Sequence, residues 1–157
     1  MNYQNYSSIF TTPVEKIGVR IVDDTLTSIT WLPDNVPILD SNSSFSNKIQ
    51  SLILQYLEDG RPLPDIPMTL TGTNFQLKVW NALRNIKMGQ VTTYGDLASK
   101  LQTSSRAVGQ ACRTNPVVIF VPCHRVVSAS GIGGYMGKKN RINIKSWLLE
   151  HEKVNVR

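Results

Sequence analysis

The sequence has few of the features of a secreted or membrane-bound protein. It contains two cysteines among 157 residues, too few and too close together to predict a disulfide framework. No run of 18 apolar residues is present, which excludes a transmembrane helix, and the first residues form no basic and apolar leader. We therefore expect a cytoplasmic protein with two free thiols and no membrane association.

Acidic residues are scarce in the second half of the chain. Residues 70–157 hold 13 Lys and Arg against three Asp and Glu, whereas residues 1–69 hold four Lys and Arg against eight Asp and Glu. The net charges of the two parts are +10 and −4, which together give the overall +6. A strongly basic part predicts a polyanionic partner, although a solubilising surface would have the same composition.

The first 69 residues predict a small α/β domain with an antiparallel sheet and one helix. Between residues 17 and 32, two stretches of alternating apolar residues flank an Asp-Asp-Thr turn, which indicates a β-hairpin. From Phe45 the apolar spacing becomes helical, and Gly60 is a typical C-terminal stop for that helix. Three prolines follow within six residues, just before the charge changes sign, so we place a domain boundary near residues 62–70.

Residues 70–157 predict a mainly helical domain of the winged-helix or helix-turn-helix kind. Thr73 begins a helix with the sequence of a capping box. Two further short helices, over about 93–101 and 105–113, are joined by a tight turn, which is typical of a helix-turn-helix. A last helix is expected from about residue 141 to residue 153.

The helix over residues 105–113 is unusual in its small side chains. Ala107, Gly109 and Ala111 would allow it to approach another surface closely. Tight packing against another helix would explain the same residues and is the commoner situation.

The segment around Cys123 carries most of the candidate chemistry. Cys123 follows an apolar run over 117–121, which we expect to be buried, and Pro122; His124 and Arg125 come directly after it. Cationic or hydrogen-bonding neighbours lower the pKa of a thiol and favour the thiolate, which is the nucleophile. A buried, inert cysteine would fit the same residues. A zinc site is disfavoured, because the spacing of the cysteines and histidines matches no common zinc pattern.

A set of motifs in one order extends from about residue 70 to residue 153. They are Thr73-x-Phe75-Gln76-x-x-Val79-Trp80-x-Ala82-Leu83, Tyr94-Gly95-x-Leu97-Ala98, Arg106-Ala107-Val108-Gly109, Asn115-Pro116, Pro122-Cys123-His124-Arg125-Val126, Gly134-Tyr135 and Trp147-Leu148-Leu149-x-His151-Glu152. On these motifs the chain resembles the O6-alkylguanine-DNA alkyltransferases, which repair O6-methylguanine. The family usually has a small α/β domain at its N-terminus, compatible with the hairpin and helix predicted here.

The resemblance implies direct reversal of DNA damage by a stoichiometric methyltransferase that needs no cofactor and no metal. The protein would bind double-stranded DNA containing O6-alkylguanine as a monomer and flip the base into a pocket. Cys123 would accept the alkyl group irreversibly, once per molecule, and O4-alkylthymine is a further conceivable substrate. His124 would remove the thiol proton through a water, oriented by Glu152. We expect residues 123 and 124 to be extended, so that their side chains point opposite ways and favour a bridging water.

The resemblance also implies residues that support the fold of the site and contact DNA. Asn115 would brace the turn before the active-site segment through bonds from its side chain to the backbone. Arg106 would fill the gap that the flipped base leaves, and Tyr94 would press the base out and donate to the guanine ring. The full set on the side of the DNA and the base is Tyr94, Arg106, Ala107, Gly109, Arg113, Arg125 and Tyr135.

The chain departs from the family at two points. Residues 1–69 contain no Cys and no His, so we do not expect the structural zinc that some members hold there. Met136 stands in the pocket loop where relatives often carry a small residue, which puts the tolerance of bulky alkyl groups in question. The alternatives are a lesion-recognition protein without alkyl transfer, a winged-helix regulator and a cysteine hydrolase. Cys123 argues against the first of these, because such proteins lack the acceptor cysteine.

Overall fold

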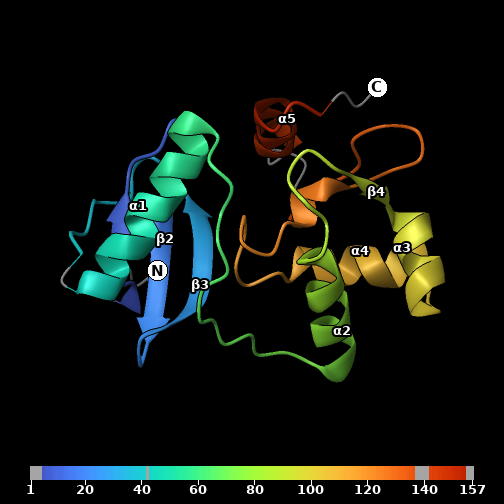
Figure 1. Ribbon diagram of the computed structural model, residues 1–157, viewed down its shortest axis with the longest axis horizontal. Helices are drawn as coiled ribbons and strands as arrows, with labels where there is room; N and C mark the ends of the chain where they lie inside the picture. The colour runs from blue at the N-terminus through green and yellow to red at the C-terminus, as the bar shows by residue number, and fades with distance from the viewer. Residues whose placement is uncertain (1–4, 42, 137–141, 155–157) are drawn as a thin grey trace. The chain divides into compact units, whose positions relative to one another are not determined.

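The computed structural model describes residues 5–41, 43–136 and 142–154. The chain divides into two compact units (Figure 1). The first comprises Met1–Leu70 together with Pro116–Val118, and the second comprises Thr71–Asn115 together with Ile119–Arg157. Within the described ranges, no helix is long and apolar enough to cross a membrane.

The first unit contains a three-stranded antiparallel sheet. Strands β1 (Ser8–Phe10), β2 (Lys16–Val22) and β3 (Thr25–Leu32) lie in this order in the sheet. The predicted hairpin is confirmed as β2 and β3. Asp23 and Asp24 both adopt positive φ, 52° and 56°, as a two-residue hairpin turn of type I′ requires. Strand β1 was not predicted, because three residues are too few to show an alternating pattern.

One helix, α1 (Ser44–Asp59), packs across a face of this sheet (Figure 1). The Ser43 side chain caps its first turn by accepting from the Ser46 backbone. The helix ends at Gly60, whose left-handed φ of 71° suits glycine, as the sequence predicted. Its buried apolar residues recur at helical spacing and form the core against the sheet: Ile49, Ile53, Tyr56 and Leu57.

The first unit is not one continuous stretch of sequence. The backbone N–H of Ile29 donates to the Pro116 carbonyl at 3.0 Å, so the segment 116–118 adds to β3 as a short parallel neighbour. The chain therefore returns to the first unit just before it reaches the cysteine segment.

The second unit is mainly helical, as predicted. Its helices are α2 (Asn74–Leu83), α3 (Tyr94–Leu101), α4 (Ser105–Arg113) and α5 (Ile142–His151), and its two short strands, β4 (Thr92–Thr93) and β5 (Val126–Val127), pair in parallel. The predicted capping box at Thr73 is confirmed, with both of its hydrogen bonds to Gln76 present. Arg141, near the expected start of the last helix, lies outside the described residues.

Helices α3 and α4 match the two short helices that the sequence predicts. Helix α3 ends at Gln102, which adopts a left-handed φ of 56° and turns the chain. The Ser104 side chain then caps α4 by accepting from the Ala107 backbone. Nε1 of Trp80 donates to the Ala111 carbonyl at 2.8 Å, which ties α4 to α2. Helices α3 and α4, joined by a three-residue turn, thus have the arrangement of a helix-turn-helix, and the buried side chain of Trp80 fixes α4 in place.

Candidate active site

Cys123 follows a rigid backbone turn and is almost fully buried, at 3% exposure. Pro122 has φ −83° and ψ 66°, and the Cys123 N–H donates to the Val121 carbonyl at 2.8 Å, which together define an inverse γ-turn. The Asn115 side chain donates from Nδ2 to the same carbonyl at 2.7 Å. Proline and asparagine therefore fix the backbone that presents the thiol.

The cysteine segment is helical and not extended, so the expectation of an extended chain at residues 123 and 124 was wrong. Cys123–Arg125 form a 3-10 helix, η2, which the N–H of Arg125 closes by donating to the Pro122 carbonyl at 3.0 Å. A 3-10 helix has about three residues per turn, so neighbouring side chains diverge by about a third of a turn. The thiol and the imidazole consequently do not point to opposite sides of the chain.

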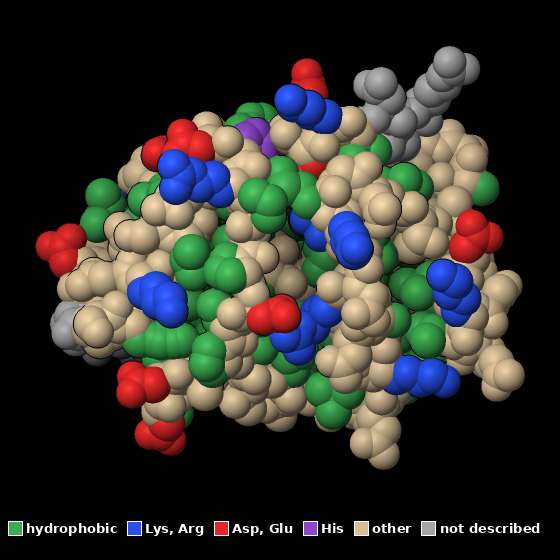
Figure 2. Space-filling model, viewed as in Figure 1, with side chains coloured by type: hydrophobic (Ala, Val, Ile, Leu, Met, Phe, Trp, Pro, Cys, Tyr) green, Lys and Arg blue, Asp and Glu red, His purple; other side chains and the backbone are tan. Residues whose placement is uncertain are grey.

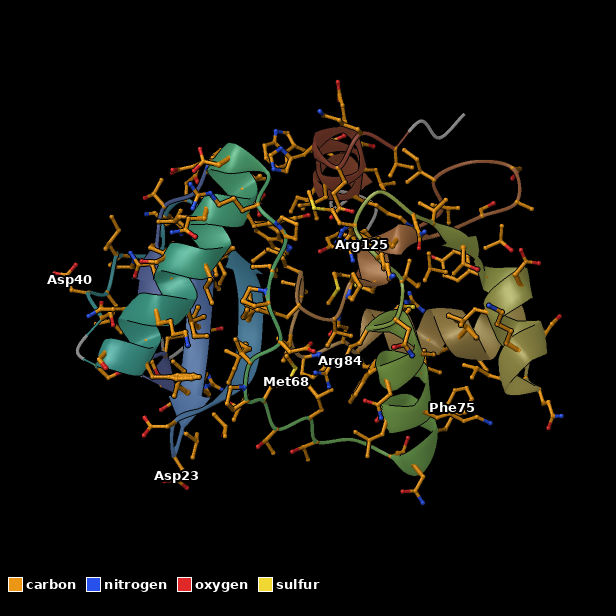
Figure 3. All side chains as sticks on the ribbon, viewed as in Figure 1. Asp23, Asp40, Met68, Phe75, Arg84 and Arg125 are labelled. Atoms are coloured by element: carbon orange, nitrogen blue, oxygen red, sulfur yellow. The ribbon has the colours of Figure 1, made fainter. Side chains whose placement is uncertain are left out.

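A buried ionic cluster adjoins the thiol. Nε2 of His124 lies 2.8 Å from Oε2 of Glu152, and both side chains are inaccessible to solvent. Arg125, labelled in Figure 3, donates from Nε to Oε1 of Glu152 at 2.8 Å and from Nη2 to Oε2 at 3.0 Å. Its Nη1 donates to the Ile86 carbonyl at 2.6 Å. The guanidinium thus makes bidentate hydrogen bonds to both oxygens of the carboxylate, which is the strongest geometry for this ion pair.

This arrangement keeps Glu152 charged and His124 neutral. Burial alone would raise the pKa of the Glu152 carboxyl, but hydrogen bonds and charge from His124 and Arg125 bring that pKa well below its usual range. Burial lowers the pKa of His124. An ionised carboxylate can only accept, so Nε2 of His124 carries the proton and Nδ1 has a free lone pair. Nδ1 is buried and, among the described residues, has no hydrogen-bond partner.

Cys123 itself is a protonated thiol at neutral pH. Burial raises its pKa to about 11, and a hydrogen bond from Asn115 and the charge of Lys145 offset this only in part. A nucleophilic role therefore needs a base that takes the thiol proton during the reaction. His124, neutral and with Nδ1 available, is the candidate for this base.

Lys145 on α5 is fully buried, and the sequence analysis missed it. Its Nζ donates to the Val126 carbonyl at 2.6 Å, to the Gly134 carbonyl at 2.9 Å and to the Tyr94 hydroxyl at 3.4 Å. Burial lowers its pKa to about 8. A signal for it was present, because Lys145 precedes the apolar pair 148–149 by three and four residues and so shares a helix face with it.

Tyr94 and the loop that follows residue 131 pack against each other. The Tyr94 hydroxyl lies 3.4 Å from the Gly134 carbonyl and donates to it. Gly133 has φ 80°, and a Cβ there would lie 3.0 Å from the tyrosine ring. Tyr135 is buried at 2% exposure. Burial raises the pKa of Tyr94 well above its ordinary value, so its phenol remains a hydrogen-bond donor at neutral pH.

The outer face of α4 carries the remaining predicted residues. Arg106 and Arg113 are exposed, and Ala107 and Gly109 are half-buried. A Cβ at Gly109 would meet no atom within 4 Å, so the helix is open to an approaching surface there. Ala111 is different: it is buried, and its carbonyl accepts from Trp80, so it belongs to the packed side of the helix.

Basic side chains are spread over the surface without forming one continuous patch on the face that Figure 2 shows. The structure places Arg125 in the interior, where its side chain is 11% exposed and paired with Glu152. Among the described residues, no three His, Cys, Asp or Glu side chains gather in a way that could hold a metal ion.

A helix-turn-helix with an open outer face, next to a buried cysteine and a His–Glu pair, defines a nucleic-acid-binding protein with a candidate nucleophile. Residues 74–154 match the family model described as "6-O-methylguanine DNA methyltransferase, DNA binding domain". The methylated-DNA–protein-cysteine methyltransferase of Metallosphaera sedula is 38% identical over 114 residues, which are 73% of this chain and 71% of that protein. The chain belongs to the methylated-DNA–protein-cysteine methyltransferase family.

Solved structures show the same similarity. The O6-methylguanine methyltransferase of Mycobacterium tuberculosis is 32% identical, with a TM-score of 0.79 over 92% of this chain and 90% of that chain. The structure described as Mycobacterium tuberculosis OGT in complex with DNA gives a TM-score of 0.75 over 92% of this chain and 91% of that chain, also at 32% identity.

Proposed function

We propose that this protein repairs O6-alkylguanine in double-stranded DNA by moving the alkyl group irreversibly onto Cys123, once per molecule. The observation that carries this proposal is the buried Cys123 thiol, protonated at neutral pH, directly followed by a neutral His124 whose Nε2 is hydrogen-bonded to Glu152. The names of the relatives point to the same reaction class, since they are methylated-DNA–protein-cysteine methyltransferases.

The transfer is a single displacement. Sγ of Cys123 attacks the alkyl carbon, the sulfur–carbon bond forms, and the bond from that carbon to O6 breaks. The thiol proton passes through a water to Nδ1 of His124 and finally to the released guanine, so a thiol and an O6-alkylguanine become a thioether and guanine. Tyr94 donates to the guanine ring as negative charge develops on it, because its hydroxyl stays protonated. Nothing in the reaction regenerates the thiol.

Arg125 acts in this scheme by positioning another residue. Its two bonds to Glu152 keep the carboxylate ionised and correctly turned toward His124. The carboxylate fixes the tautomer of the imidazole and stabilises its positive charge once it has taken the proton. This role replaces the DNA contact that the sequence suggested for Arg125. Asn115 positions the thiol in the same indirect way, through the Val121 carbonyl.

On the DNA side, we propose that the outer face of α4 enters the minor groove. Ala107 and Gly109 allow the close approach, Arg106 occupies the space that the flipped base leaves, and Arg113 contacts a phosphate. Tyr94 and Tyr135 line the pocket for the flipped base. All of these residues come from the second unit of one chain, so a monomer suffices. The reaction requires a reduced Cys123, which fits a reducing compartment such as the cytoplasm.

The test is an intact mass after reaction with a duplex that contains one O6-methylguanine. We expect each chain to gain one methyl group, located on Cys123 by peptide mapping. Cys112→Ala is the matched control, because Cys112 is the second buried free cysteine. It should react normally, whereas Cys123→Ala should gain nothing. Binding without any mass gain would instead identify a lesion-recognition protein or a regulator, and repeated turnover without DNA would identify a hydrolase.

A further inference from the structure

The Met136 side chain covers the thiol of Cys123. The two sulfur atoms lie 3.9 Å apart, with the S–H of Cys123 directed at the Met136 thioether. Cys123 is 3% exposed, and Met136, whose thioether contacts the thiol, is half-buried.

The backbone that carries Met136 is anchored just before it. The Gly134 carbonyl accepts from Nζ of Lys145 at 2.9 Å and from the Tyr94 hydroxyl at 3.4 Å. Tyr135, the next residue, is 2% exposed. The bond from Lys145 and the burial of Tyr135 fix the backbone just before Met136, so the Met136 side chain is the part that an incoming group displaces. Methionine permits this, since its unbranched chain has three rotatable bonds.

The size of the alkyl group decides how far Met136 must move. A reacting carbon has to come within about 3–3.5 Å of the nucleophile, and the thioether already contacts Sγ at 3.9 Å. A methyl group needs only a small rotation of the methionine, whereas a benzyl group needs the whole side chain to leave.

We propose that Met136 is a specificity-determining residue that restricts the acceptor Cys123 to small alkyl groups. This inference rests on the proposed alkyl transfer and adds the size of the group to it. The thioether also engages the S–H in the resting protein, so displacement by the substrate frees the proton for its route to His124.

The experiment compares Met136→Ala with Met136→Leu, which preserves the side-chain volume. Met136 has φ 53°, and both variants keep a Cβ at this strained position, so the backbone cost is common to them. Single-turnover rate constants are measured with duplexes that contain one O6-methylguanine or one O6-benzylguanine. Met136→Ala should raise the ratio of the benzyl rate to the methyl rate by about tenfold or more, as removal of a steric block in a pocket does. Met136→Leu should keep that ratio near the wild-type value.

A second measurement needs no DNA. Met136→Ala should speed the alkylation of Cys123 by N-benzyl iodoacetamide more than its alkylation by iodoacetamide, as scored by peptide mapping. An unchanged benzyl-to-methyl ratio with normal methyl transfer would overturn the inference and leave the proposed function intact. A lower ratio would also overturn it, because the thioether would then favour the ring through a sulfur–aromatic contact. Failure of the wild-type protein to take up methyl from DNA would refute the proposed function, and this inference with it.

Discussion

Replacement of Glu152 by glutamine tests the central electrostatic argument. The change preserves the shape of the side chain but removes the negative charge that pairs with Arg125 and accepts from His124. The amide can still accept from one of these groups, but its NH2 then faces the other donors. Glu152→Gln should therefore reduce both the stability of the fold and the rate of alkyl transfer.

The magnitude follows from burial. The Glu152 side chain is inaccessible, and that of Arg125 is 11% exposed, so the variant leaves a cation in the interior without its partner charge. Breaking a buried ion pair in this way costs about 3–5 kcal/mol. For a chain of this size such a loss lowers the melting temperature by about 6–20 °C. Since the free energy of unfolding of a domain is only about 5–15 kcal/mol, the variant should still fold but keep only a small part of that free energy.

The rate effect is separable from the stability effect. Alkyl transfer is measured at a temperature where circular dichroism shows the variant fully folded, and there the rate should fall by up to about 10⁴, because the amide no longer fixes the tautomer of the base His124 or stabilises its protonated form. The matched control is Glu150→Gln, an exposed carboxylate on α5, which should change stability by less than about 0.5 kcal/mol and leave the rate unchanged. The reasoning fails if Glu152→Gln melts and reacts like the Glu150 control.

Three further predictions concern neighbouring parts of the site. Lys145→Met should slow alkyl transfer by about tenfold or more, because the loop that carries Gly134 loses the donor that holds it. Lys153→Met, at an exposed position, is the control. Equal rates for these two variants would argue against a positioning role of Lys145. Arg106→Ala should slow repair in duplex DNA but not the reaction with free O6-methylguanine, and Lys100→Ala corrects for loss of a charge. Equal slowing of both reactions would place Arg106 in the pocket. Between pH 6.5 and about 4.5, the free energy of unfolding should fall by up to about 1.4 kcal/mol per pH unit as the pH drops, because the folded state holds His124 neutral while the unfolded chain binds a proton. Denaturant titrations that show the same slope for His124→Gln would contradict this.

The secondary structure followed from the sequence where local signals were strong. The hairpin, the capping box at Thr73 and the glycine stop at Gly60 each depend on a few adjacent residues, and each was predicted. The short strand β1 and the return of residues 116–118 to the first unit were not, because both depend on pairing with distant segments. Ile119, which follows this return, has φ 76°, a conformation that no local preference of isoleucine would suggest.

The site shows the same division between local and distant information. The motifs supplied the identities of Cys123, His124 and Glu152, but only the fold brings Glu152 within 2.8 Å of a histidine 28 residues earlier. The 3-10 turn at Cys123 could not be read from the sequence, because proline followed by cysteine is equally compatible with an extended chain. Lys145 was missed for a different reason: it shares a helix face with the buried pair 148–149, but lysine is rarely buried, and this general tendency outweighs the spacing.

The buried cations also change what the basic composition means. Of the 13 Lys and Arg in residues 70–157, Arg125 and Lys145 are enclosed in the site and satisfied by a carboxylate, carbonyls and a hydroxyl. They cannot neutralise phosphates, and instead set the charge state around the thiol and the carboxylate. A count of charges therefore overstates the DNA-binding face. Since each neutralised phosphate contributes about −0.9 to the slope of log K against log salt, the slope should reflect only exposed residues such as Arg106 and Arg113. The basic composition correctly indicated DNA as the partner, although two of the cations that make it basic, Arg125 and Lys145, act within the site around Cys123.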